Sequence, residues 1–177
     1  MKKIFLIAAV AMLASCGGNE NAGGNAGGEQ KDSVATEQAA QAQGAVAAEN
    51  DYFQVTAVPE GWEVNKDINM ERQIEVKLKP GTDLGEWQNV TVEFMDVKEP
   101  QECVDMLLQG SEATRKAGDD VTIGDRTFKQ VQWINSADIS CALLGKTPKG
   151  VAQIILTEKL TVDNPAVKAI IEGIKFK

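Results

Sequence analysis

Apolar and polar residues alternate one by one along several segments after residue 51, and this feature restricts the fold most. Both Ile74 to Lys79 and Val90 to Phe94 follow the pattern. A period of two residues places the apolar side chains on one face of a strand. Short turns rather than helices separate most of these segments, which predicts an antiparallel sheet. The expected strands are residues 52–58, 63–68, 74–79, 90–94, 128–134, 139–144 and 151–157, with a shorter extended piece at 121–123.

The period changes in two places. Residues 100–116 carry their apolar side chains on one helical arc, with Pro100 at the first position and Gly118 as the stop. A closing helix begins at Asn164-Pro165, a cap residue followed by proline. The expected fold class of residues 52–177 is therefore α+β, an antiparallel sheet flanked by helices. About 126 residues suffice for an independent core, because a domain of this size buries roughly two-thirds of its unfolded surface.

The N-terminus has the features of an export signal. Two lysines precede an uncharged apolar run that ends in Leu13-Ala14-Ser15-Cys16. This ending resembles the lipobox of bacterial lipoproteins. The resemblance implies that residues 1–15 are a signal peptide and that the Cys16 thiol carries a lipid with acyl chains such as palmitate. It also implies an extracytoplasmic protein, and Gly17 in place of Asp favours the outer over the inner membrane.

Residues 16–51 are expected to be the lipidated cysteine and a flexible tether. Gly, Ala, Asn, Gln and Glu dominate this segment, and it has no Leu, Ile or Met after the signal. Such a composition buries too little apolar surface to offset the entropy of ordering. Asp32-Ser33-Val34 matches a pattern that takes an O-glycan in exported proteins of some Gram-negative bacteria, so Ser33 is a candidate acceptor.

Composition excludes several kinds of site. None of the 177 residues is His, and acids outnumber bases 26 to 18. Without imidazole the chain cannot form Ser-His-Asp or Cys-His catalytic systems or a His-ligated zinc site. Phosphate-loop, dinucleotide and calcium-loop motifs are also missing from the sequence. The net charge of −8 argues against nucleic-acid binding. We expect no cofactor, no metal and no catalytic residue.

Residues 53–62, Phe-Gln-Val-Thr-Ala-Val-Pro-Glu-Gly-Trp, resemble the opening of PsbP-like domains, in which a first strand runs into a Pro-x-Gly-Trp turn. The turn at residues 123–126 before a long strand, and the terminal helix, follow in the same order. The family includes PsbP and the bacterial DcrB-like lipoproteins. The resemblance implies an antiparallel sheet flanked by helices and an accessory or binding role, with no catalytic residue to carry over.

Cys103 and Cys141 remain once Cys16 is lipidated. Outside the cytoplasm an even pair can form a disulfide. Cys103 lies on the predicted inner face of the first helix, and Cys141 lies on a strand that this helix could cover. Two states stay open, a disulfide and two buried free thiols.

Trp87 lies in the polar segment Gly85-Glu86-Trp87-Gln88-Asn89. An exposed aromatic residue in a loop is a candidate contact for a sugar, a peptide or a partner protein. The alternative is partial burial beside Pro80.

Together these features predict a membrane-anchored cell-envelope lipoprotein that acts as a non-catalytic binding or accessory module. Its partners would be the membrane, through Cys16, and an envelope protein or glycan. One alternative is a carrier of a small molecule or lipid, held in a pocket between sheet and helix. A second alternative is a glycan hydrolase that uses carboxylates alone, which requires two carboxyl groups roughly 5–9.5 Å apart in a cleft.

Overall fold

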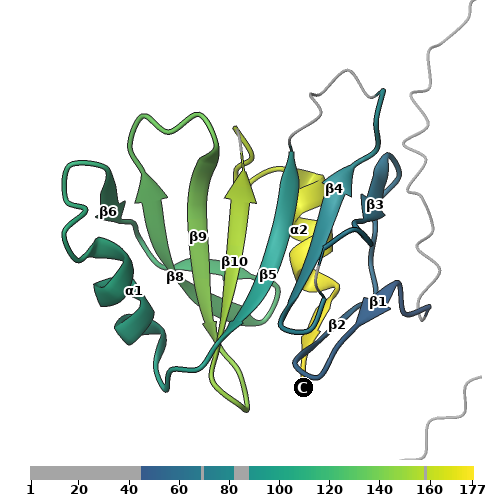
Figure 1. The fold of residues 1–177 in the computed structure, drawn as a ribbon, viewed down its shortest axis with the longest axis horizontal. Helices are drawn as coiled ribbons and strands as arrows, with labels where there is room; N and C mark the ends of the chain where they lie inside the picture. Colours follow the sequence, from purple (N-terminus) through teal and green to yellow (C-terminus); the bar gives the residue numbers. More distant parts are fainter. Residues whose placement is uncertain (1–44, 69, 82–87, 158) are drawn as a thin grey trace, which may run out of the picture. The chain divides into compact units, whose positions relative to one another are not determined.

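The structure, a computed structural model, describes residues 45–68, 70–81, 88–157 and 159–177 (Figure 1). The order of elements is strands, a helix, strands, a second helix and a last strand, so the predicted α+β class is confirmed. The strands are β1 (Ala48–Glu49), β2 (Phe53–Val55), β3 (Trp62–Val64), β4 (Gln73–Leu78), β5 (Asn89–Met95), β6 (Arg115–Ala117), β7 (Val121–Ile123), β8 (Arg126–Trp133), β9 (Ile139–Lys146), β10 (Val151–Thr157) and β11 (Ile174–Phe176). The helices are α1 (Pro100–Leu108) and α2 (Pro165–Glu172).

A large antiparallel sheet forms the centre of the domain. Its strands follow the order β3-β4-β5-β10-β9-β8-β6 (Figure 1). Strand β7 pairs with β8 beside this path. In β4 and β5 the side chains alternate between buried and half-buried, as the sequence predicts. The predicted hairpin is present as β9 and β10. The Thr147 hydroxyl stabilises its turn by accepting hydrogen bonds from the backbone N–H groups of Lys149 and Gly150.

The main core lies between one face of this sheet and α2. Val167, Ile170 and Ile171 of α2 are fully buried there, with the inward side chains of β4, β5, β9 and β10. The helix begins at Asn164, whose side chain accepts hydrogen bonds from the backbone N–H groups of Ala166 and Val167, as the predicted cap requires. A small antiparallel sheet, β1-β2-β11, contributes Phe53 and its neighbours to the same core.

The Pro59-Glu60-Gly61-Trp62 segment forms the tight turn that leads from the small sheet to the large one. The N–H of Trp62 donates to the carbonyl of Pro59, and Gly61 has φ = +80°. That geometry is a type II turn, which favours glycine at its third position. Trp62 enters the core and is only 5% exposed. This motif therefore has a clear structural role.

Helix α1 covers part of the opposite face. Cys103 and Val104 pack with Val131 and Leu144 of the sheet in a second, smaller cluster. The prediction of a helix over 100–116 is wrong at its end, because α1 stops at Leu108 and Gly110 turns the chain with φ = +66°. Residues 115–117 instead form β6 and extend the sheet at its edge.

The predicted domain boundary at residue 52 is also too late. Ala48 and Glu49 already pair with β2, and the Asn50 side chain shapes the turn between the two strands by accepting from the N–H groups of Tyr52 and Phe53. An Asx turn of this kind forms without apolar residues, which is why the composition of the segment did not reveal it. None of the helices in the described parts of the chain is long and apolar enough to span a membrane.

Candidate functional site

The α1-side face of the large sheet is divided into a covered half and an uncovered half. Helix α1 packs over β6, β8 and β9, whereas no described helix covers β3, β4, β5 and the adjoining part of β10. Strand alternation places the polar residues of these four elements on the uncovered half. We call this surface the open face; it consists of Glu63, Asn65, Gln73, Glu75, Lys77, Asn89, Thr91, Glu93, Gln153 and Ile155.

One part of the open face is internally paired. The Glu75 carboxylate accepts a hydrogen bond from Asn65 Nδ2 at 2.7 Å on one oxygen and from Thr91 Oγ1 at 3.3 Å on the other. Lys77 Nζ lies 3.9 Å from a carboxylate oxygen of Glu63, its cross-strand neighbour. These contacts hold the side chains in place across three strands, so this part of the surface is preorganised.

The adjoining part is not paired. Gln73 on β4 is opposite Glu93 on β5, and Glu93 is opposite Gln153 on β10. We call these three residues the amide–carboxylate row. Their side chains make no hydrogen bond or ion pair with any residue in the described part of the chain. Gln153 is only 7% exposed, while Gln73 and Glu93 are half-buried.

The open face is rich in hydrogen-bonding and charged groups. It carries three carboxylates, one ammonium group, and the amide and hydroxyl groups of its Asn, Gln and Thr residues. Within the described residues no group of three or more His, Cys, Asp or Glu is placed to hold a metal ion. The surface offers many hydrogen-bond donors and acceptors and a net negative charge, which suits the binding of a polar partner.

A hollow of about 350 Å³ lies where the first turn of α1 meets the sheet. Its charged groups are paired with one another: Lys146 Nζ is 2.6 Å from a Glu99 oxygen, and Lys129 Nζ is 2.9 Å from an Asp120 oxygen. These four side chains are 44–62% exposed. The hollow is therefore a solvated depression at the edge of the covered half, and we call it the α1 hollow.

A second hollow, of about 360 Å³, surrounds Arg126, and here the arginine has a structural role. Its guanidinium donates to the carbonyl oxygens of Ile171 and Ile174, at the end of α2 and the start of β11. Arg126 of β8 thereby ties this strand to the end of α2 and to the start of β11. Burial lowers the pKa of Arg126, while Asp125 and Glu172 oppose that shift.

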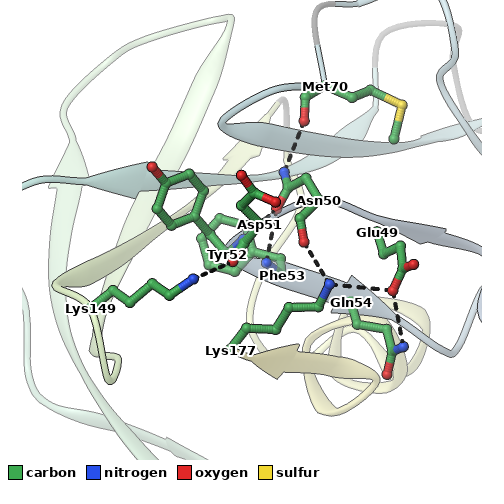
Figure 2. A network of polar contacts seen from close by, with 9 residues as sticks. All are labelled: Glu49, Asn50, Asp51, Tyr52, Phe53, Gln54, Met70, Lys149 and Lys177. Atoms are coloured by element: carbon green, nitrogen blue, oxygen red, sulfur yellow. Dashed lines mark hydrogen bonds and ion pairs between the residues drawn. The ribbon is translucent and has the colours of Figure 1, made fainter.

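Polar contacts fix the turn between β1 and β2 to three distant segments (Figure 2). Asn50 Nδ2 donates to the carbonyl of Met70 at 2.9 Å, while Lys177 Nζ donates to the carbonyl of Asn50 at 2.6 Å. From the hairpin loop, Lys149 Nζ donates to the carbonyl of Asp51 at 2.7 Å. Hence the first residues of the domain are held to its last residue and to two loops.

An aromatic stack adds to this junction. The rings of Tyr52 and Phe94 are stacked with centroids 3.9 Å apart. A cation lies over each of them, Lys149 Nζ at 5.3 Å from the Tyr52 ring centre and Arg72 Cζ at 5.3 Å from the Phe94 ring centre. This arrangement buries aromatic surface beside the polar network and strengthens the same junction.

The two cysteines lie on opposite sides of the sheet and are both free and buried. Cys103 belongs to the cluster under α1, together with Leu144 of β9. Cys141 is three residues before Leu144 on the same strand, so it points to the other face, and it packs in the main core. The candidate disulfide is not formed in the structure, and the intervening sheet separates the two thiols.

Burial raises the pKa of both thiols. For Cys103 the nearby Glu102 carboxylate adds to the effect of burial. For Cys141 a hydrogen bond with Gln130 acts in the opposite direction. A raised pKa keeps a thiol in its unreactive protonated form, so both residues behave as small apolar core residues.

Three sites expected from the sequence lie outside the described residues: the lipidation site Cys16, the candidate glycan acceptor Ser33 and the candidate partner contact Trp87. Conversely, no local pattern in the sequence singles out Gln73, Glu93 or Gln153. Strand alternation marks Glu93 as outward-facing, but the register of three strands was needed to bring the three side chains into one row.

No family model and no curated protein matches the chain. Among solved structures the chain is similar to that of cyanobacterial PsbP (CyanoP) from Synechocystis sp. PCC 6803, with a TM-score of 0.39 and 9% sequence identity. The match covers 71% of this chain and 86% of the cyanobacterial protein.

Proposed function

We propose that this protein is a lipid-anchored cell-envelope lipoprotein whose domain is a non-catalytic binding or accessory module, and that the open face is its binding surface. The observation that carries the proposal is the uncovered half of the α1-side face, with its preorganised polar side chains and one row of unpaired groups. The lipobox-like end of residues 13–16 supports the anchor. The PsbP-like opening at residues 53–62 supports a PsbP-like fold and an accessory role.

In this proposal the acyl chains on Cys16, rather than the protein surface, hold the molecule to the membrane. Gly17 in place of Asp supports the outer membrane over the inner one. The chain has a net charge of −8, and acidic proteins are not attracted to anionic lipid. More than one acyl chain would be needed for stable anchoring. The segment between Cys16 and the first strand would let the domain reach its partners.

The anchor is tested by metabolic labelling with a radioactive fatty acid. The wild-type chain should incorporate the label and sediment with the membrane fraction, while Cys16→Ala should do neither. A variant with Cys103→Ala serves as the matched control and should label like the wild type. Equal labelling of the Cys16→Ala variant would contradict lipidation at this residue.

The binding role is tested by amine-reactive crosslinking in cells, followed by purification through an affinity tag. Lys77 is the only lysine of the open face, and Lys168, on α2, is a control on the opposite side of the sheet. A reproducible partner with crosslinks at Lys77 and few at Lys168 is the expected result. If no partner recurs between replicates, the binding role is contradicted.

A carrier function is the second candidate, because the α1 hollow lies between sheet and helix and has a volume of about 350 Å³. Its exposed, paired charges favour a small polar ligand over a lipid chain. Native mass spectrometry of protein purified from its own cells distinguishes this function, since a carrier should retain an adduct mass that Lys129→Ala loses. No observation on the described residues favours a carboxylate-dependent glycan hydrolase.

A further inference from the structure

The amide–carboxylate row has hydrogen-bonding capacity that the described part of the protein does not use. Gln153 is the most informative member, because more than nine-tenths of the residue is removed from water and its amide makes no hydrogen bond to a described residue. Among the described residues the buried side-chain polar atom without a partner is Arg115 Nε, so the amide atoms of Gln153 still reach the surface of the open face. The stem of Gln153 is packed between its neighbours, while its unpaired amide is presented to a group that lies on the open face.

We infer that this row binds a lysine or arginine side chain that a partner protein presents. The inference rests on the proposed binding function and names the chemistry of the partner. Glu93 would supply the carboxylate, and Gln73 and Gln153 would supply amide oxygens on either side of it.

The spacing of the row suits such a group. Neighbouring strands lie about 4.8 Å apart, so the three side chains project side by side from β4, β5 and β10. An ammonium group has three N–H donors and a guanidinium has five, while a carboxylate only accepts. A cation over Glu93 can therefore bond to the carboxylate and to both amide oxygens, and such charge-assisted bonds are the stronger kind.

Charge distinguishes this ligand from the alternatives. The open face carries Glu63, Glu75 and Glu93 against Lys77, which already lies near Glu63. An anionic ligand would be repelled. A neutral glycan could bond to the amides, but covering Glu93 with it would bury a carboxylate without a compensating charge, which is costly. A basic side chain avoids this cost because it neutralises Glu93.

The experiment measures fluorescence anisotropy of a labelled octapeptide of alternating Gly and Lys, titrated with the full chain in non-ionic detergent. The same peptide with acetylated lysines is the uncharged control, and a chitin tetrasaccharide is added as a competitor. Glu93→Gln removes the charge without changing the shape, and Gln153→Met removes the amide but keeps the length. Glu112→Gln, an exposed acid on the loop after α1, changes the net charge equally and is the matched control.

We expect Glu93→Gln to weaken binding about tenfold, Gln153→Met several-fold and Glu112→Gln less than twofold, with little binding of the acetylated peptide. Urea unfolding of each variant establishes that it is folded. Three results would overturn the inference: equal weakening by Glu112→Gln, equal binding of the acetylated peptide, or displacement by the tetrasaccharide. In any of these cases a partner crosslinked at Lys77 would still support the proposed binding function.

Discussion

The two faces of the large sheet differ in how completely other elements of the chain cover them. On one face β2, β11 and α2 close over side chains that are almost completely removed from water, among them Ile74, Leu143 and Ile154. On the other face α1 covers β6, β8 and β9 and leaves the open face polar and half-exposed. The same strands contribute to both faces through alternate residues. The buried apolar side chains that stabilise the domain are thus concentrated on one side of the sheet, and the proposed binding surface lies on the other.

The largest expected difference in stability is between substitutions at two adjacent residues of β10 that point to opposite faces. Ile154→Ala should reduce the free energy of unfolding by about 3 kcal/mol, because the side chain is fully buried and leaves a cavity. Ile155→Ala, on the open face, should cost about 1 kcal/mol or less. Urea unfolding of the two variants makes the comparison. Equal losses would mean that both faces contribute equally to stability.

The reactivity of the two free cysteines gives a second comparison of the two faces, because one thiol lies on each side of the sheet. Both thiols should react with iodoacetamide at pH 8 at least about 100-fold more slowly than in urea, because burial raises the pKa of each and limits access. Cys103, held by the smaller cluster under α1, should react before Cys141, although Cys103 is the less exposed in the static structure. Peptide mapping over time gives the order. Faster modification of Cys141 would show that the α2 side opens first.

An intermediate effect is expected at the junction in Figure 2. Asn50→Ala removes the acceptor for two backbone N–H groups and the donor to Met70, and should cost about 1–2 kcal/mol. Gln54→Ala, whose side chain makes one exposed hydrogen bond to Glu49, is the control and should be almost neutral. Amide hydrogen exchange should show faster exchange in β1 and β2 of the Asn50→Ala variant. Unchanged exchange there would contradict the role of the network.

The smallest losses of stability are expected at the starts of the two helices. Asn164→Ala should cost about 1 kcal/mol, since its side chain caps α2. The side chain of Glu99, the corresponding residue before α1, makes no capping hydrogen bond and pairs with Lys146 at an exposed site. Glu99→Ala should therefore change stability by only a few tenths of a kcal/mol. A larger loss of unfolding free energy for Glu99→Ala than for Asn164→Ala would contradict this assignment of the two cap residues.

Local patterns in the sequence were sufficient to predict β4, β5, the β9–β10 hairpin and the start of each helix. Each depends on side-chain periodicity or on a cap residue that acts over a few positions. The predicted end of the first helix, at residue 116, was wrong because residues 115–117 pair with β8 instead of continuing the helix. Strand β1 was missed because it is specified by one Asx turn.

The candidate site was harder to predict from the sequence, because it depends on contacts between residues that are far apart in the chain. Alternation indicates that Glu75 and Glu93 face away from the apolar side, but it does not say which half of that face α1 covers. The amide–carboxylate row joins residues 73, 93 and 153, whose proximity depends on the register of three strands. For Cys141, both faces of β9 are apolar, so alternation did not show whether its thiol faces the first helix, and the side of the sheet on which α1 packs decided the matter.

The central claim, that the open face is the binding surface, is tested most directly by placing a photo-crosslinking amino acid at single positions in cells. One variant carries it at Glu93, and the other at Asp163, an exposed residue just before α2. We predict a light-dependent adduct of defined mass for the Glu93 position and none for the Asp163 position. An adduct at Asp163 with none at Glu93 would contradict the assignment of the open face.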